Sequence, residues 1–304
     1  MIQIVLVGLG AGAAAATLFA SVVSGSIAAV FLFYLAPLPI LIAALGWSHV
    51  AGLIAAASAS AIVGYLSGFF FISVFVIAFG AWWLGYLALL ARPVANGGGG
   101  GLEWYPIGRL VLWAAIIGAL VVAAAVPNFG TDQASLQASL RKTYERILRD
   151  QSVIDVLVVA VPPAAAVFST ITNVLNLWLA ARIVKVSGRL PRPWPDISAL
   201  TLPASAAGWL AAAIAGSFLP DLLGILSGVL AAGLLMAFAI LGFAVLHAIT
   251  RGLNSRFILL AGCYAASAMF GWPVLAMAIL GLADTVFDIR GRVATKRGPP
   301  TLRT

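Results

Sequence analysis

Four side chains that can form hydrogen bonds recur at helical spacing inside one long apolar run. They are Ser169, Thr172, Asn173 and Asn176. Residues three, four and seven positions apart lie on one face of an α-helix, so the spacing predicts a polar stripe. In lipid this stripe must contact protein or water, because an unsatisfied amide or hydroxyl is costly there. Two interpretations stay open: interhelical hydrogen bonds that fix packing, or the lining of a substrate cavity at mid-membrane.

A second group of side chains carries charge and stands at the ends of two later apolar runs. Its members are His247, Arg251, Asp284, Asp288 and Arg292. Asp288 and Arg292 are four positions apart with the acid first, the favourable orientation for an ion pair on a helix. Asp284 has no local partner, so we expect an arginine of the 251–256 loop to pair with it. The group is expected to form a charge lock between two helix ends, or a coupling surface or proton path.

Residue types for catalysis or metal binding are scarce in this chain. The stretch Gly46-Trp47-Ser48-His49 lacks the Gly-x-Ser-x-Gly elbow of a serine hydrolase. Two histidines and the single cysteine, Cys263, cannot supply a three-histidine zinc centre or a thiolate cluster. We therefore expect no catalytic residue, metal site or cofactor, and predict that the chain is not an enzyme.

These polar residues stand out because the rest of the chain is strongly apolar. Hydrophobic residues make up 63% of the 304 positions and charged residues 9%, with a mean hydropathy of +1.11. A soluble domain carries roughly 25% charged residues. Apolar runs of about 20 residues, long enough to cross a hydrocarbon layer of ~30 Å, recur along the chain. The composition predicts an all-α, polytopic transmembrane bundle whose main partner is the lipid bilayer.

Glycines, prolines and charged residues divide the chain into about ten spans, although eight or nine would also fit. The expected spans cover about 2–21, 27–46, 50–66, 68–91, 107–126, 153–186, 200–219 and 222–250, and a broken pair within 257–288. Pro37 and Pro39 should kink the second span, and Pro162-Pro163 should bend the sixth. The first span lacks the positive n-region of a signal peptide, so we expect it to be retained.

The domain organisation follows from these breaks. We expect one integral membrane domain, 1–304, with a first helical bundle (1–91), a glycine-rich cytoplasmic linker (92–106), a second bundle (107–288) and a basic cytoplasmic tail (289–304). The five glycines Gly97–Gly101 indicate a flexible linker, because no strand, lysine or Ser/Thr of a phosphate loop accompanies them.

The segment 131–150 is amphipathic and too polar to span. Its apolar residues Leu136, Leu140, Ile147 and Leu148 recur at helical spacing, and its four bases fall outside that stripe. We predict a helix in the membrane interface, with its leucines in the acyl boundary and its bases among headgroups. Docking of a partner protein is the alternative.

The net charge of +8 is explained by membrane topology and not by nucleic acid, because the bases flank spans. With an even number of spans and both termini inside, thirteen of the seventeen bases are cytoplasmic. These are Arg92, Arg109, Arg182, Lys185, Arg189, Arg192, Arg251, Arg256, Arg290, Arg292, Lys296, Arg297 and Arg303. The other four belong to the amphipathic helix, which this topology places outside.

Three short motifs carry a resemblance to a known family. They are Leu35–Ile40 in the kinked span, His247–Gly252, and Gly281–Asp284 continuing through Asp288–Arg290. Together they resemble the YybS-like family, an uncharacterised group of bacterial multi-pass membrane proteins, over nearly the whole chain. Members are thought to be similar in fold to the substrate-binding S components of energy-coupling-factor vitamin transporters. The resemblance implies a bacterial inner (plasma) membrane protein and assigns no ligand-contacting residue.

Two functions are therefore expected from the sequence. The first is a substrate-binding or transport-related membrane subunit, in which the stripe Ser169 to Asn176 faces a small-molecule substrate and the cytoplasmic charges contact a partner. The alternative is a non-catalytic scaffold or assembly factor. It would bind other membrane or cytoplasmic proteins through the amphipathic helix and the proline-rich loop Arg189–Pro195.

Overall fold

The computed structural model describes residues 1–66, 68, 71–94 and 101–297. The regular secondary structure of the described chain is helical apart from one antiparallel hairpin, β1 (Ala91–Pro93) and β2 (Leu102–Trp104). The α-helices are α1 (Ile2–Ala20), α2 (Ile27–Tyr34), α3 (Pro37–Gly46), α4 (His49–Leu66), α5 (Phe71–Leu89), α6 (Ile107–Ala125), α7 (Gln133–Glu145), α8 (Gln151–Val186), α9 (Ser205–Gly216), α10 (Asp221–Ile249), α11 (Arg256–Phe270), α12 (Pro273–Phe287) and α13 (Ile289–Arg297). Short 3₁₀ turns, η1 (Ser21–Ser24), η3 (Val126–Asn128) and η4 (Ile197–Ala199), join some of them.

The predicted all-α membrane bundle is confirmed. Seven helical segments are long and apolar enough to cross a membrane: Ile2–Ser24, Ile27–Gly46, His49–Leu66, Phe71–Leu89, Ile107–Asn128, Gln151–Val186 and Asp221–Ile249. Three shorter apolar helices, α9, α11 and α12, occupy the other expected spans. The break between α11 and α12 falls at Gly271, whose φ of 70° suits a residue without a side chain.

Proline explains the break in the second span. Pro37 and Pro39 have no backbone N–H, and the helix is interrupted between Tyr34, where α2 ends, and Pro37, where α3 begins. The N–H of Leu38 donates to the carbonyl of Leu35 at 2.9 Å and so does not serve the carbonyl four residues back. The carbonyl of Tyr34 is therefore left for another donor.

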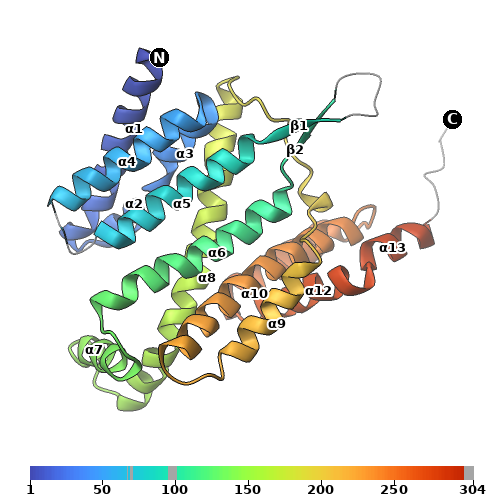
Figure 1. Ribbon diagram of the computed structural model, residues 1–304. Coiled ribbons are helices and arrows are strands. Elements are labelled where there is room, and N and C mark those ends of the chain that lie inside the picture. Colours follow the sequence, from blue (N-terminus) through green and yellow to red (C-terminus); the bar gives the residue numbers. More distant parts are fainter. Residues whose placement is uncertain (67, 69–70, 95–100, 298–304) are drawn as a thin grey trace.

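The helix α8 runs through the middle of the molecule and contacts both of its halves (Figure 1). At 1.5 Å per residue its 36 residues extend about 54 Å, well beyond a ~30 Å hydrocarbon layer. The helix continues through Pro162 and Pro163. One core gathers α1 to α5 around α8, and a second gathers α6, α9, α10 and α12.

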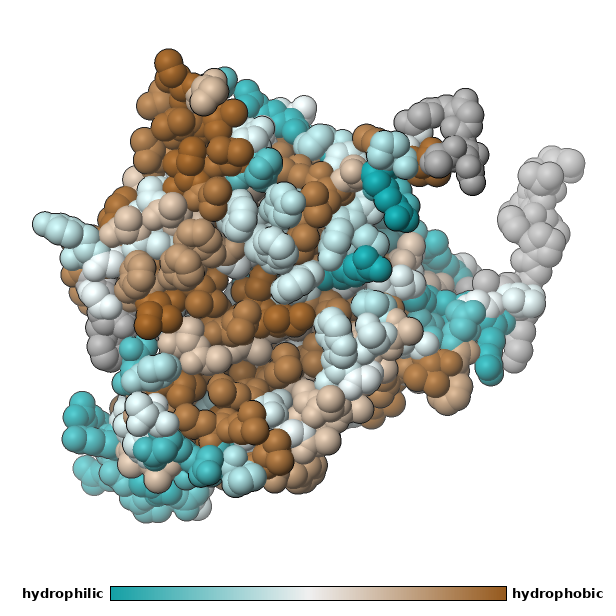
Figure 2. Space-filling model, in the orientation of Figure 1, coloured by the Kyte–Doolittle hydropathy of each residue, from teal (hydrophilic) through white to brown (hydrophobic). Residues whose placement is uncertain are grey.

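Most of the described basic residues gather at one end of the bundle, which we call the basic end. There Arg189 stacks on Trp47, Arg192 donates to the carbonyl of Ala88, and Arg251 pairs with Asp196. The opposite end carries α7. Hydrophilic residues cover α7 and the region of α13 in Figure 2, and apolar residues dominate the surface between them. An apolar belt between two polar ends is typical of a membrane-embedded bundle.

The amphipathic segment is helical, but its leucines do not lie where we expected. Leu136 and Leu140 are buried against Ile154 and Val158 of α8, with residues of α10 at the edge. These two leucines therefore face protein and not acyl chains. Ile147 follows the end of α7 and is 75% exposed. Asp132 caps α7 by accepting from the backbone N–H of Ser135 at 2.8 Å.

Glycines allow several helix pairs to pack closely. A Cβ at Gly242 of α10 would lie 1.8 Å from the carbonyl oxygen of Met277, and one at Gly281 of α12 would lie 2.1 Å from that of Phe238. Gly8 and Gly12 allow α1 the same close approach to α4. Of the glycine run predicted to form a linker, residues 97–100 lie outside the described chain, and the described Gly101 leads into β2.

Candidate functional site

The predicted polar stripe of α8 faces other helices. Asn173 is buried, and its Nδ2 donates to the carbonyl of Ala114 in α6 at 3.1 Å. Asn176 is buried as well, and its Nδ2 donates to the carbonyl of Tyr34 at 2.8 Å. Thr172 turns its hydroxyl back to the carbonyl of Ser169 at 3.0 Å. The structure therefore gives the two asparagines the packing role that was one of the two interpretations.

The bond from Asn176 has a definite cause in the sequence. The proline break leaves the Tyr34 carbonyl without its usual helical donor, and the amide of Asn176 supplies one inside the apolar core. Buried backbone carbonyls are nearly always satisfied, and more strictly so in lipid. This contact joins residues 142 positions apart and fixes the kinked second span against α8.

The other side of the stripe borders a cavity, which we call the α7-side cavity. Its volume is about 380 Å³, within the range of ~300–1,000 Å³ usual for small-molecule pockets. The lining residues are Phe33, Tyr34, Pro37, Ser73, Ile77, Val121, Val122, Ala125, Val126, Phe129, Leu136, Leu140, Val161, Pro162, Ala165, Ser169, Thr172 and Asn173. Three of the four predicted stripe residues thus line a cavity, and Asn176 does not.

The lining is apolar with a few uncharged polar groups. Among the described lining residues none carries a charge, so an ion entering the cavity would meet no countercharge there. Ser73 of α5 contributes a hydroxyl that is buried and has no hydrogen-bond partner. The Oδ1 atom of Asn176, outside the lining, is also buried without a partner. A buried donor or acceptor without a partner requires an explanation. A polar group of a bound ligand would supply a partner for the Ser73 hydroxyl.

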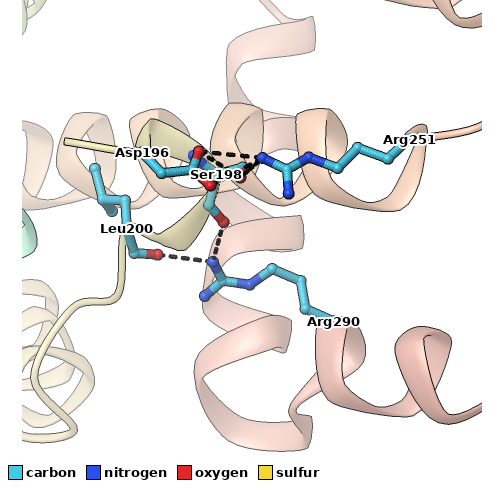
Figure 3. Close-up of polar contacts among 5 residues, drawn as sticks. All are labelled: Asp196, Ser198, Leu200, Arg251 and Arg290. Atoms are coloured by element: carbon cyan, nitrogen blue, oxygen red, sulfur yellow. Dashed lines mark hydrogen bonds and ion pairs between the residues drawn. The ribbon is translucent and has the colours of Figure 1, made fainter. Parts of the chain in front are cut away.

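Asp284 of the predicted charge lock has a different partner from the one expected. Its carboxylate pairs at 2.8 Å with Arg290 of α13, and the Asp284 side chain is only 4% exposed. Arg290 also donates to the carbonyls of Ser198 and Leu200, at 2.9 and 2.8 Å, as Figure 3 shows. The pair therefore ties the loop before α9 to the end of α12.

Arg251 is turned toward that same loop. It pairs at 2.9 Å with Asp196 and also contacts the hydroxyl of Ser198 (Figure 3). The Ser198 hydroxyl first, and then the Arg251 guanidinium, lower the pKa of Asp196 from 3.8 to about 2. We call the contacts among Asp196, Ser198, Arg251, Asp284 and Arg290 the loop latch.

The remaining members of the predicted lock take separate roles. His247 Nε2 lies 3.1 Å from the hydroxyl of Tyr264 and links α10 to α11. Asp288 accepts at 3.2 Å from the backbone N–H of Gly291, at the start of α13. Among the ion pairs of the described chain, none joins Asp288 to Arg292. Four of the five predicted residues thus contact four different partners, Tyr264, Asp196, Arg290 and Gly291, and the five do not form one lock.

The sequence did not predict Asp196 and Ser198 of the loop latch, or the cavity-lining residues Ser73 and Tyr34. Asp196 and Ser198 form a capping pattern, in which the Asp196 carboxylate accepts at 3.0 Å from the backbone N–H of Ser198. That Asp-x-Ser pattern is a recognisable signal. No local sequence pattern predicts that Ser73 and Tyr34 line the same cavity as α8, because both residues are far from α8 in the sequence.

Comparison of the chain with protein-family models, with curated proteins and with solved structures found no match. The resemblance to the YybS-like family rests on the short sequence motifs alone.

Proposed function

We propose that this protein is a substrate-binding or transport-related membrane subunit that takes a small, uncharged and mainly apolar molecule in the α7-side cavity. The observation that carries the proposal is the coincidence of the predicted polar stripe with that cavity. Ser169, Thr172 and Asn173 line one wall, and Ser73 presents an unpartnered hydroxyl from the facing helix α5.

The chemistry of the ligand follows from the lining. An ion would lose its hydration in the apolar surroundings without gaining a charged partner, which disfavours carboxylates, phosphates and ammonium groups. A hydroxyl or carbonyl group on an otherwise apolar body suits the serine and threonine hydroxyls. Taking about 30 Å³ for each water-sized group, the cavity holds on the order of a dozen heavy atoms.

The proposed orientation places the basic end in the cytoplasm of a bacterial cell, with the chain in the inner membrane and both termini inside. Support comes from the short, arginine-rich connections gathered at that end. The cavity then lies in the outer half of the bundle, beside α7.

Ligand screening by thermal shift tests the proposal. Uncharged amphiphiles with one hydroxyl or carbonyl group should raise the Tm of the purified protein, because a ligand that binds only the folded state stabilises it. Ser73→Ala should weaken that rise. Ser60→Ala is the matched control, since Ser60 is a buried serine outside the cavity whose hydroxyl bonds its own helix at 2.8 Å. An equal loss in both variants, or a rise only with charged ligands, would contradict the proposal.

The alternative function, a non-catalytic scaffold, draws less support from the same structure. The apolar side of α7 is occupied by α8. In the proline-rich loop, Arg189 lies over the Trp47 ring and Arg192 donates to the carbonyl of Ala88. Both segments that were expected to bind partners are therefore engaged within the chain.

A further inference from the structure

A second cavity lies along α8 at the basic end, beneath the loop 190–200. Its volume is about 170 Å³, and its walls come from α3, α5, α6, α8 and α10. Trp178 of α8 and Trp194 of the loop line it, and Arg192 is the one charged residue among its described lining residues. The same helix therefore borders the α7-side cavity with its residues 161–173 and this basic-end cavity with residues 174–181.

Two cations lie over the ring of Trp194, and a third, Arg192, lines the basic-end cavity together with Trp194. Lys185 Nζ lies 4.7 Å from the centre of the Trp194 ring and the Arg182 guanidinium 5.6 Å from it. Arg192, two residues before Trp194, donates to the carbonyl of Ala88 at 3.3 Å, and partial burial lowers its pKa. The tryptophan ring attracts the cations but does not neutralise them.

No carboxylate of the described residues forms an ion pair with these three cations. The acids at this end have other partners: Glu103 pairs with Arg92, Asp196 with Arg251 and Asp284 with Arg290, and Asp288 accepts from the backbone N–H of Gly291. The two cations over this ring repel each other, and Arg192, two residues before Trp194, adds a third positive charge. An anion placed among them would relieve that repulsion and bind the guanidinium groups through several donors.

We propose that Arg182, Lys185 and Arg192 bind the phosphate headgroup of an anionic glycerophospholipid, with part of one acyl chain in the basic-end cavity. A lipid fits better than a free anion because the cations adjoin an apolar cavity and Trp178, which is 45% exposed on a membrane-spanning helix. Tryptophan and basic residues together are typical of the membrane–water interface. Taking about 30 Å³ for each group, the cavity holds roughly six carbons, a chain segment.

This site lies closer to the C-terminal end of α8 than the cavity of the proposed function does, and its ligand is anionic whereas the other ligand is uncharged. Failure of the lipid site leaves the proposed function untouched, and failure of the uncharged-ligand screen leaves the lipid site untouched. The experiment uses the full chain in nanodiscs of equal parts phosphatidylglycerol and phosphatidylcholine, and native mass spectrometry counts the lipids that stay bound.

The wild-type chain should retain phosphatidylglycerol over phosphatidylcholine, with about a fivefold preference for each contributing cation. The variant Arg182→Gln/Lys185→Gln/Arg192→Gln should lose that preference. The matched control, Lys142→Gln/Arg146→Gln/Arg149→Gln, removes the same charge from α7 and the turn after it, and should keep the preference.

Two results would overturn the proposal. One is equal phosphatidylglycerol retention by the two triple variants. The other is displacement of phosphatidylglycerol by inorganic phosphate at equal concentration, which would show that the cations hold a free anion. If the first triple variant fails to fold, the single variant Lys185→Gln is measured in its place. The Lys185 side chain is exposed, so this substitution should leave the fold intact. It should lower retention about fivefold, and unchanged retention would count against the site.

Discussion

The buried ion pair of the loop latch allows a quantitative prediction. Replacing Arg290 by methionine leaves the Asp284 carboxylate, 4% exposed, without its ionic partner, although the backbone N–H of residue 290 still donates to it. The change also removes the donors to the carbonyls of Ser198 and Leu200. Breaking a buried pair from one side costs about 3–5 kcal/mol. The exposed pair of Arg92 and Glu103 is the matched control at the same end, and Arg92→Met should cost only about 0.2–1 kcal/mol.

Unfolding in mixed micelles with increasing SDS, followed by circular dichroism, measures both free energies. The double variant Asp284→Leu/Arg290→Met should be more stable than Arg290→Met alone, because it no longer buries a lone carboxylate. If Arg290→Met cost no more than Arg92→Met, or if the double variant were the least stable of the three, the argument from burial would be refuted.

Three further predictions concern helix contacts and pH. Gly242→Ala, whose Cβ would meet the Met277 carbonyl at 1.8 Å, should destabilise by about 1–3 kcal/mol, whereas Gly262→Ala in open space should not destabilise in the same SDS titration. Asn176→Leu removes the donor to the Tyr34 carbonyl and should lower the free energy of unfolding by about 0.6 kcal/mol, and at most ~1.7 kcal/mol. A larger loss than that of Arg290→Met would contradict this role of Asn176. The pKa of Asp196 is lowered to about 2, so its contribution is fully present above pH 3.8 and is lost as pH falls through about 2. Limited proteolysis of the loop should therefore increase below pH 3 in the wild type, with Asp196→Asn cleaved alike across that range.

The spans were predictable because long apolar runs and their breaks are local properties. The ten expected segments have counterparts, and the pair expected within 257–288 is divided at Gly271. The kink at Pro37 followed from a missing N–H. Three expected spans form helices of only 12 to 15 residues, because hydropathy does not show where turns shorten a helix.

Partners distant in the sequence were not predictable. The amphipathic pattern of α7 was correct, but periodicity cannot distinguish a face turned to lipid from one turned to Ile154. Asp284 pairs with Arg290, six residues later in the sequence. The helix is interrupted at Asp288 between them, so the spacing rules for ion pairs within one helix did not predict this pair. The polar stripe was visible in the sequence, whereas the unpartnered Ser73 opposite it required the fold.

Occupancy of the α7-side cavity tests the central claim most directly. Ala165 lines that cavity and is exposed, so Ala165→Phe should fill the space without disturbing the core; Ala164→Phe, exposed and outside the lining, is the matched control. Mass spectrometry of small molecules extracted from the purified proteins should show an uncharged, mainly apolar compound with the wild type and Ala164→Phe, and none with Ala165→Phe. The same compound retained equally by all three proteins would contradict binding in this cavity.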